Sequence, residues 1–124
     1  MNKTIQRTAI LISIPFIALI NSAATEKDTP REVFEQRCSG CHTLDKLKAG
    51  PPLRNVYSRK AGSDKTFLYS DALKASTVRW DDATLDRWLI DTDSVISGND
   101  MPFRLNNKEE RAKIIAYLKE LSKK

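Results

Sequence analysis

Apolar residues recur at helical spacing after Asp81, and a capping pattern marks another helix further upstream. After Asp81 the apolar residues follow at intervals of three and four, namely Leu85, Trp88 and Leu89. This spacing is typical of a helix with one buried face. Upstream, Thr29 followed by Pro30 and Glu32 is the pattern of a helix N-terminus, with proline in the first helical turn. We therefore predict one helix from Pro30 into Cys38 and another after Asp81.

A third helix is predicted near the C-terminal end of the sequence. It starts near Asn106 or Asn107, with two glutamates in its first turn and lysines towards its end, as the helix dipole favours. Its buried face is expected to consist of Ile114, Ile115, Leu118 and Leu121. A shorter helix is expected from about Ser70 to Ala75.

The segments between these helices have the composition of loops. Glycine and proline interrupt residues 44–67 and 92–106, and no stretch of the chain shows a convincing strand pattern. Loops this long are unusual in a chain of 124 residues, because they leave little apolar surface for a core. The prediction is an all-α domain with three main helices, whose centre is filled by something other than side chains.

The first residues have the pattern of a secretory leader. Lys3 and Arg7 precede an apolar run from Ala9 to Ile20, and small residues follow up to Ala24. The run has 12 residues, whereas spanning a bilayer takes about 20, so an uncleaved membrane anchor is the weaker interpretation. We expect removal of residues 1–24, which leaves residues 25–124 as one periplasmic domain without stable membrane insertion.

The distribution of charge argues against one class of partner. The formal net charge of +5 comes from 21 basic and 16 acidic residues that are interspersed along the chain. Removing Lys3 and Arg7 with the leader would lower that charge by two. Because no long run of like charges remains, nothing in the sequence indicates a nucleic-acid partner.

Two cysteines and a histidine form the strongest motif. Cys38, Cys41 and His42 have the CxxCH spacing at which c-type haem is attached. Two thiols three positions apart on a helical turn can each add to one vinyl group of the same porphyrin. The adjacent imidazole then lies under the iron. The spacing therefore predicts a covalently bound haem with His42 as one iron ligand.

Three other interpretations of the motif remain open. A structural disulfide suits an oxidising compartment, and a thioredoxin-like redox pair uses the same spacing, although it expects a βαβ context that the sequence lacks. Zinc requires four ligands, and beside Cys38 and Cys41 the chain has a single histidine. Covalent haem is the interpretation that we favour.

Met101 is the candidate for the second iron ligand. His42 is the only histidine, which excludes ligation by two histidines, and loss of Met1 leaves Met101 as the only thioether. Met101 lies in a loop between Gly98 and Pro102 rather than on a helix face, where methionine more often fills the core. A histidine–methionine pair raises the reduction potential and leaves no open position on the iron, which favours electron transfer over bond-making.

These residues, in this order, resemble the class I cytochromes c from Thr29 to Leu121. Beside the CxxCH motif, the resemblance rests on Phe34, Gly50-Pro51, Arg59-Lys60-Ala61-Gly62, Phe67-Leu68-Tyr69-Ser70-Asp71-Ala72, Trp80, the Met101 loop with Phe103, and Ile115-Ala116-Tyr117-Leu118. The resemblance implies a small cytochrome c fold wrapped around one haem c, which is attached through Cys38 and Cys41.

The resemblance also implies roles for individual residues. The carbonyl of Pro51 would accept the N–H of His42, which fixes the orientation of the imidazole. Arg59, Tyr69 and Trp80 would bind or neutralise the haem propionates. The terminal helix would cross the first helix.

The sequence departs from mitochondrial members of that family around the expected haem edge. Asp93 and Asp100 stand where those proteins have lysines, so their ring of docking lysines is not expected here. The alternative hypothesis is that a mixed rim of Arg37, Lys46, Asp93 and Asp100 sets the choice of partner.

The implied function is that of a monohaem c-type cytochrome, a non-enzymatic one-electron carrier that acts as a monomer between redox partner proteins. A second hypothesis is a haem peroxidase or a gas or redox sensor in which Met101 is a labile ligand. A peroxidase is disfavoured because no second histidine is present to act as an acid–base group over the iron. A third hypothesis is a thiol–disulfide protein without haem, which would be colourless.

Overall fold

The structure, a computed structural model, describes residues 27–123. Along these residues the chain forms α1 (Pro30–Cys38), α2 (Asp71–Ala75), α3 (Asp82–Ile90), α4 (Thr92–Val95) and α5 (Lys108–Glu120). Within residues 27–123 the pairing between strand-like segments is limited to one isolated bridge, which joins Lys60 and Arg79. No helix in that range is long and apolar enough to cross a membrane. The predicted leader, residues 1–24, lies outside the described residues.

The starts of the three main helices follow from their capping residues. Thr29 accepts a hydrogen bond from the Glu32 backbone, and the Glu32 carboxylate accepts one from the Thr29 N–H. Asp81 and Thr84 form the same reciprocal arrangement at α3, and the Asn107 side chain accepts from the first turn of α5. These contacts satisfy backbone donors that the start of a helix leaves unpaired. The all-α prediction, its three main helices and the short helix α2 are confirmed.

Two details of the prediction were wrong. Residues 92–106 were expected to be irregular, yet they contain α4. Asp91 explains this helix, because its N–H donates to the Arg87 carbonyl at the end of α3 while its side chain accepts from Asp93 N–H at the start of α4. Leu121, expected on the buried face of α5, is only half-buried and forms the C-cap of that helix.

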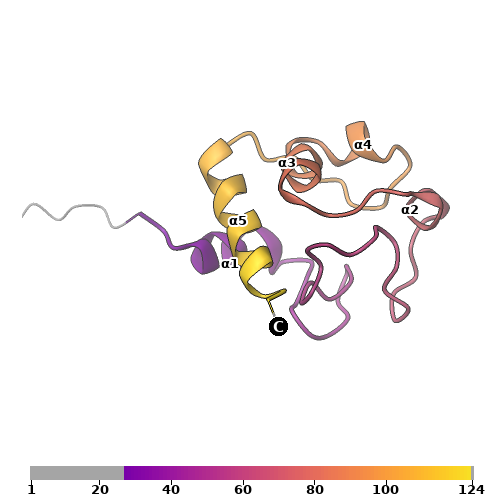
Figure 1. The fold of residues 1–124 in the computed structure, drawn as a ribbon, viewed down its shortest axis with the longest axis horizontal. Coiled ribbons are helices and arrows are strands. Elements are labelled where there is room, and N and C mark those ends of the chain that lie inside the picture. Colours follow the sequence, from indigo (N-terminus) through magenta and orange to yellow (C-terminus); the bar gives the residue numbers. More distant parts are fainter. Residues whose placement is uncertain (1–26, 124) are drawn as a thin grey trace, which may run out of the picture.

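Helices α1 and α5 cross on one side of the molecule, and α3 and α4 lie on the other (Figure 1). At the crossing the rings of Phe34 and Tyr117 are 5.1 Å apart between centroids. Val33 and Ile114 are buried there, with 2% and 1% of their surface exposed. Helix α3 packs against both α4 and α5. The expected crossing of the first and last helices is confirmed.

The loop between α1 and α2 is held by backbone hydrogen bonds instead of regular structure. The Leu53 N–H donates to the Thr43 carbonyl over 3.0 Å, which folds this loop back onto the end of α1. Gly62 turns the chain with a φ of 64°, and an added Cβ there would run into the Leu73 carbonyl. The first contact returns the loop to the residues that follow the cysteine motif, and the turn at Gly62 brings it against α2.

Candidate haem site

The cysteine motif lies at the end of α1 and in the turn that follows. The Cys41 and His42 amides both donate to the Cys38 carbonyl, over 3.1 and 2.9 Å, so the helical turn continues through the motif. Cys38 is half-buried, Cys41 is exposed, and His42 is buried. Both cysteines and the histidine line one cavity, as the CxxCH spacing predicts.

The imidazole of His42 is oriented by its predicted partner. Its Nδ1 lies 2.8 Å from the Pro51 carbonyl, so we assign the proton to Nδ1, which donates, and the lone pair to Nε2. Burial lowers the pKa of His42, and the hydrogen bond to Pro51 opposes that shift. Gly50 packs so closely against the ring that a Cβ there would overlap its atoms. A neutral imidazole held in one orientation is what a metal ligand requires.

The motif opens on a cavity of about 270 Å³ whose wall comes from α1, α2, α3, α5 and the loops. Most of the wall is apolar or aromatic, including Leu73, Leu85, Trp88, Leu89, Ile114 and Leu118. The buried faces of α3 and α5 therefore converge on a shared space in addition to packing on each other. An apolar cavity with an imidazole and a thioether in its wall fits a haem whose iron would be held by those two groups.

Met101 lines the same cavity from a separate loop and is half-buried. Its N–H donates to the Asn99 side chain over 2.8 Å, and its carbonyl accepts from the Thr92 hydroxyl over 2.5 Å. Asn99 in turn donates to the Ile96 carbonyl over 2.9 Å. The structure thus brings the predicted imidazole and thioether together. Sequence reasoning assigned no role to Thr92, whose side chain bonds the backbone nine positions away, or to Asn99, whose contacts with Ile96 and Met101 are local.

The three predicted propionate residues also line the cavity. Tyr69 and Trp80 are buried, and Arg59 is half-buried. Arg59 donates to Asp64 and to the Pro52 carbonyl over 3.4 Å each, beyond the usual range for an N–H···O bond. Such loose contacts leave the guanidinium able to bind another anion. Burial raises the pKa of Tyr69, so its phenol is protonated at neutral pH and can donate.

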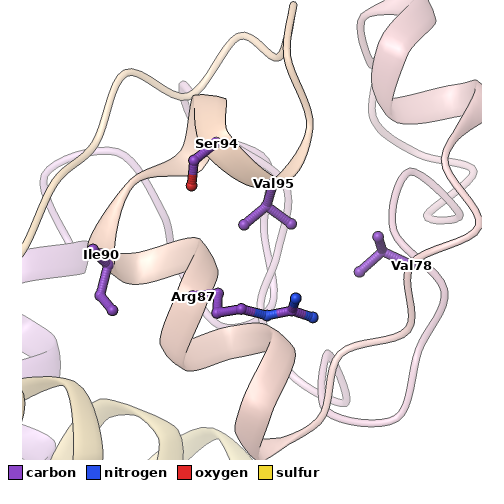
Figure 2. Close-up of a pocket in the computed structure, with 5 residues that line it drawn as sticks. All are labelled: Val78, Arg87, Ile90, Ser94 and Val95. Atoms are coloured by element: carbon purple, nitrogen blue, oxygen red, sulfur yellow. The ribbon is translucent and has the colours of Figure 1, made fainter.

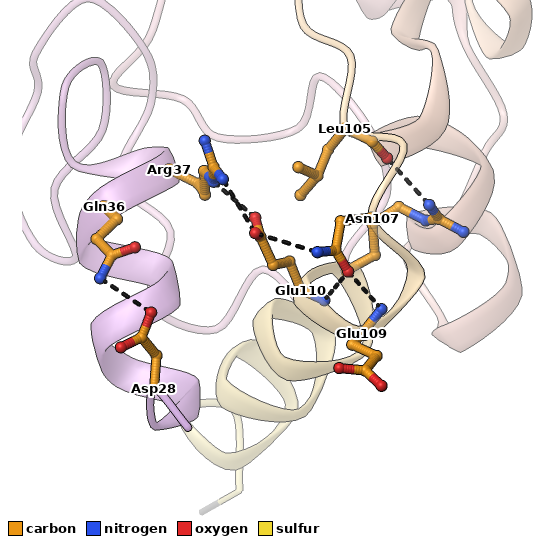
Figure 3. Close-up of polar contacts among 8 residues, drawn as sticks. Asp28, Gln36, Arg37, Leu105, Asn107, Glu109 and Glu110 are labelled. Atoms are coloured by element: carbon orange, nitrogen blue, oxygen red, sulfur yellow. Dashed lines mark hydrogen bonds and ion pairs between the residues drawn. The ribbon is translucent and has the colours of Figure 1, made fainter. Parts of the chain in front are cut away.

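An arginine next to the motif ties α1 to α5 (Figure 3). Arg37 precedes Cys38 and forms a bidentate salt bridge with the Glu110 carboxylate, with N···O distances of 2.6 and 3.0 Å. Glu110 also accepts a hydrogen bond from the Asn107 side chain over 3.3 Å. Because this pair is half-exposed, its charge contributes little to stability. Its bidentate geometry nevertheless fixes the end of α1 relative to α5.

A second arginine, Arg111, is buried and joins α5 to two other parts of the fold. It donates to the Leu105 and Asn106 carbonyls over 3.0 and 2.9 Å, and to Asp86 of α3 over 2.7 Å. Residues 105 and 106 lie on the chain that leads from Met101 into α5. Arg111 therefore anchors one end of the methionine loop, the segment 96–107 between α4 and α5, and this role was not predicted from the sequence.

The alternatives to haem fit the site poorly. Burial raises the pKa of the Cys38 thiol to about 12, whereas a redox-active thiol needs a lowered pKa. In the part of the chain that the structure describes, no group of three or more His, Cys, Asp or Glu side chains could hold a metal ion. The zinc interpretation therefore lacks a ligand set there.

A second depression shares no residue with this cavity and lies along α3 and α4 (Figure 2). It is lined by Val78, Arg87, Ile90, Ser94 and Val95. None of these is a cysteine, a histidine or another predicted site residue. The cavity beside the CxxCH motif is therefore the candidate functional site.

Known proteins share both the sequence pattern and the fold. The family model described as Cytochrome c matches residues 30–122. This chain belongs to the cytochrome c family. It is 41% identical over 118 residues to cytochrome c2 of Rhodomicrobium vannielii, which covers 89% of this chain and 94% of that protein. It is 44% identical over 87 residues to cytochrome c2 iso-2 of Magnetospirillum fulvum, which covers 68% of this chain and 91% of that protein.

A solved structure agrees with the family assignment. Cytochrome cH from Methylobacterium extorquens superposes with a TM-score of 0.69 at 36% identity, covering 73% of this chain and 94% of that one. The class I cytochrome c fold is confirmed, and with it one covalently bound haem c at the Cys38–Cys41 pair. As a member of the family, the protein is a monohaem electron carrier that works with redox partner proteins.

Proposed function

We propose that this protein is a periplasmic, non-enzymatic one-electron carrier in which His42 and Met101 are the axial ligands of the haem iron. The observation that supports this is the shared cavity, because His42 and Met101 come from separate segments and line it together with both cysteines. The bound haem supplies one redox centre that gains or loses a single electron. With His42 and Met101 both as ligands, the iron would have no position left for a substrate.

The protein's own residues provide what an electron carrier needs, namely little rearrangement when the charge changes. The Pro51 carbonyl holds the His42 ring through Nδ1. The Met101 N–H is hydrogen-bonded to the Asn99 side chain, and the Met101 carbonyl is hydrogen-bonded to the Thr92 hydroxyl. The apolar wall excludes water. This double anchoring opposes easy dissociation of Met101, so it supports an electron carrier over a sensor with a labile ligand.

Arg59, Tyr69 and Trp80 are proposed to receive the haem propionates. All three line the cavity, and the contacts of Arg59 to Asp64 and Pro52 are long enough to yield to a stronger anion. A guanidinium that pairs with a carboxylate in a partly buried site lowers the cost of burying that carboxylate.

Partner choice is proposed to depend on charges at the edge of the cavity, where the mixed rim of Arg37, Lys46, Asp93 and Asp100 was expected. Two of these four side chains also make contacts within the fold. Arg37 is paired with α5, and Asp93 accepts a hydrogen bond from the Gly98 N–H over 3.2 Å, so both have structural roles. Reversing Asp100 to lysine should change the salt dependence of electron transfer with the native partner. Asp93→Asn removes one charge but keeps an oxygen that accepts from the Gly98 N–H, so it should change that salt dependence less.

Residues 1–24 are proposed to be a leader that is removed on export, which leaves residues 25–124 as the cytochrome domain. The mass of the purified exported protein should correspond to a chain beginning at Thr25 with one haem added. Ile17→Asp, which interrupts the apolar run, should leave the leader uncleaved. An exported protein that retains residues 1–24 would contradict the proposal.

Axial ligation is tested by optical spectroscopy of the haem-bound protein. The ferric wild-type protein should show the weak near-infrared band of sulfur-to-iron charge transfer, and Met101→Ala should abolish it while covalent haem is retained. Asp100→Asn changes the adjacent exposed residue and should leave the band unchanged. Absence of the band from the wild-type protein at neutral pH, together with rapid cyanide binding, would refute ligation by Met101.

A further inference from the structure

Thr92 is a buried polar residue whose contacts are all made with the backbone around Met101 or within its own helical turn. It is the first residue of α4 and has 2% of its surface exposed. Its hydroxyl lies 2.5 Å from the Met101 carbonyl, in donating geometry. The same oxygen lies 3.5 Å from the carbonyl and from the N–H of Phe103. One side chain therefore reaches the residue proposed as iron ligand and the residue two positions beyond it.

The backbone of Thr92 reinforces this arrangement. Its N–H donates to the Phe103 carbonyl over 3.4 Å, and its carbonyl accepts from Ile96 within α4 over 3.1 Å. Thr92 thus stands between a helical turn and the methionine loop and is bonded to both. The Asn99 side chain accepts from the Met101 N–H, and the Thr92 hydroxyl donates to the Met101 carbonyl. Of these two contacts, the one from Thr92 joins Met101 to α4.

We propose that Thr92 is a positioning residue that keeps the Met101 thioether on the haem iron. The proposal depends on the proposed ligation by Met101. Opening of the methionine loop would move the Met101 backbone and separate its carbonyl from the Thr92 hydroxyl, which lies 2.5 Å away in the closed loop. A buried hydroxyl and a carbonyl that lose each other without reaching water both become unsatisfied, which disfavours the open state of the loop.

The test compares Thr92→Ser with Thr92→Ala in the haem-bound ferric protein. These two variants differ by a single hydroxyl, so the comparison isolates the hydrogen bond from the lost methyl group. Imidazole binds the iron only when Met101 has left, and its apparent affinity therefore scales with the fraction of open protein. From the net strength of one hydrogen bond, Thr92→Ala should bind imidazole about two- to tenfold more tightly than Thr92→Ser. Thr92→Ser should stay close to the wild type.

The same pair of changes at Thr84 provides the control. Thr84 is half-buried at the other end of α3, where its hydroxyl bonds Arg79 and Asp81 over 2.6 and 2.9 Å. Thr84→Ala should lower the free energy of unfolding yet leave imidazole affinity unchanged relative to Thr84→Ser. A general loss of stability would move imidazole affinity at both sites, whereas a positioning role moves it at Thr92 alone.

Equal imidazole affinity of Thr92→Ala and Thr92→Ser would overturn the proposal, as would an equal change in the Thr84 pair. If the alanine variant does not accumulate, Thr92→Val replaces it and is compared with the wild type under the same criterion. The outcome for Met101 itself is read separately. A wild-type protein without the near-infrared band means that ligation by Met101 is wrong, whereas an intact band with unaltered imidazole binding means that only the role of Thr92 is wrong.

Discussion

Replacing Arg111 with methionine tests how the methionine loop is joined to the helices. The Arg111 side chain is 7% exposed and donates to two backbone carbonyls and to Asp86, at distances from 2.7 to 3.0 Å. Methionine occupies a similar volume and packs well in irregular spaces, but it donates no hydrogen bond. The change therefore removes the polar contacts with little loss of packing, and the carbonyls of Leu105 and Asn106 lose their donor.

The expected magnitude follows from the burial of each partner. Hydrogen bonds to charged groups contribute about 1.5–3 kcal/mol, and breaking a buried ion pair costs about 3–5 kcal/mol. The Asp86 side chain is 40% exposed, so water can replace the guanidinium there and the full penalty does not apply. We expect Arg111→Met to lower the free energy of unfolding by about 2–3 kcal/mol, because most of the loss falls on the carbonyls. In a domain of this size that corresponds to a fall in Tm of roughly 10–20 °C.

Guanidinium chloride unfolding of the ferric, haem-bound protein measures this loss, with the helical circular dichroism and the haem absorbance followed together. Asp86→Asn is the matched control and should cost less, about 1 kcal/mol, because the asparagine oxygen still accepts from the guanidinium, which also keeps both carbonyl partners. The double variant should show coupling, because the two side chains touch. A loss below about 1 kcal/mol for Arg111→Met, or an equal loss for Asp86→Asn, would show that the carbonyls of the methionine loop do not account for most of the stability.

Two further predictions concern the histidine and the start of α3. Gly50→Ala should displace the His42 ring and lower the yield of haem-bound protein. Gly40→Ala should leave the yield unchanged, since nothing lies within 4 Å of a Cβ at Gly40, and equal yields from the two variants would contradict the expected overlap. Hydrogen bonds from Thr84 hold the pKa of Asp81 below its ordinary value of 3.8, and the bond from the Thr84 backbone N–H has the largest effect. The stability from this carboxylate is therefore present above pH 3.8 and lost as pH falls through the lowered pKa. Asp81→Asn keeps a cap without the titration, so its acid-unfolding curve should be flatter below about pH 4.

The three main helices could be predicted because their start signals are local. Thr29 with Glu32, Asp81 and Asn107 each act within about one turn, and nothing distant is needed to interpret them. Helix α4 escaped prediction because it spans a single turn. Its start depends on Asp91 ending one helix and beginning another, which residue preferences alone do not reveal.

The candidate site divides in the same way. Cys38, Cys41 and His42 are nearly contiguous, so their spacing alone predicts the chemistry. Met101 was found by elimination, as the thioether that remains once the leader is set aside. Its shared cavity with His42 could only be inferred, because their proximity depends on how α3, α5 and two loops pack.

Thr92 and Arg111 were not found, since each acts by bonding backbone carbonyls beyond its own helical turn, nine and eleven positions away for Thr92 and five and six for Arg111. A carbonyl has no sequence signature, so such contacts exist only in the folded structure. Arg111 left one trace. It precedes Ile114, Ile115 and Leu118 at helical spacing and so lies on the apolar face of α5, where a charged residue indicates a buried partner.

The pairing of α1 with α5 has a consequence for biosynthesis. Arg37 and Glu110 are separated by 73 positions, which ribosomes take roughly 4–15 s to add at ordinary elongation rates. Until α5 has been made, Val33 and Phe34 of α1 have no helix to pack on, and Arg37 lacks Glu110. Helix α1 can therefore dock only when nearly the whole domain has been made.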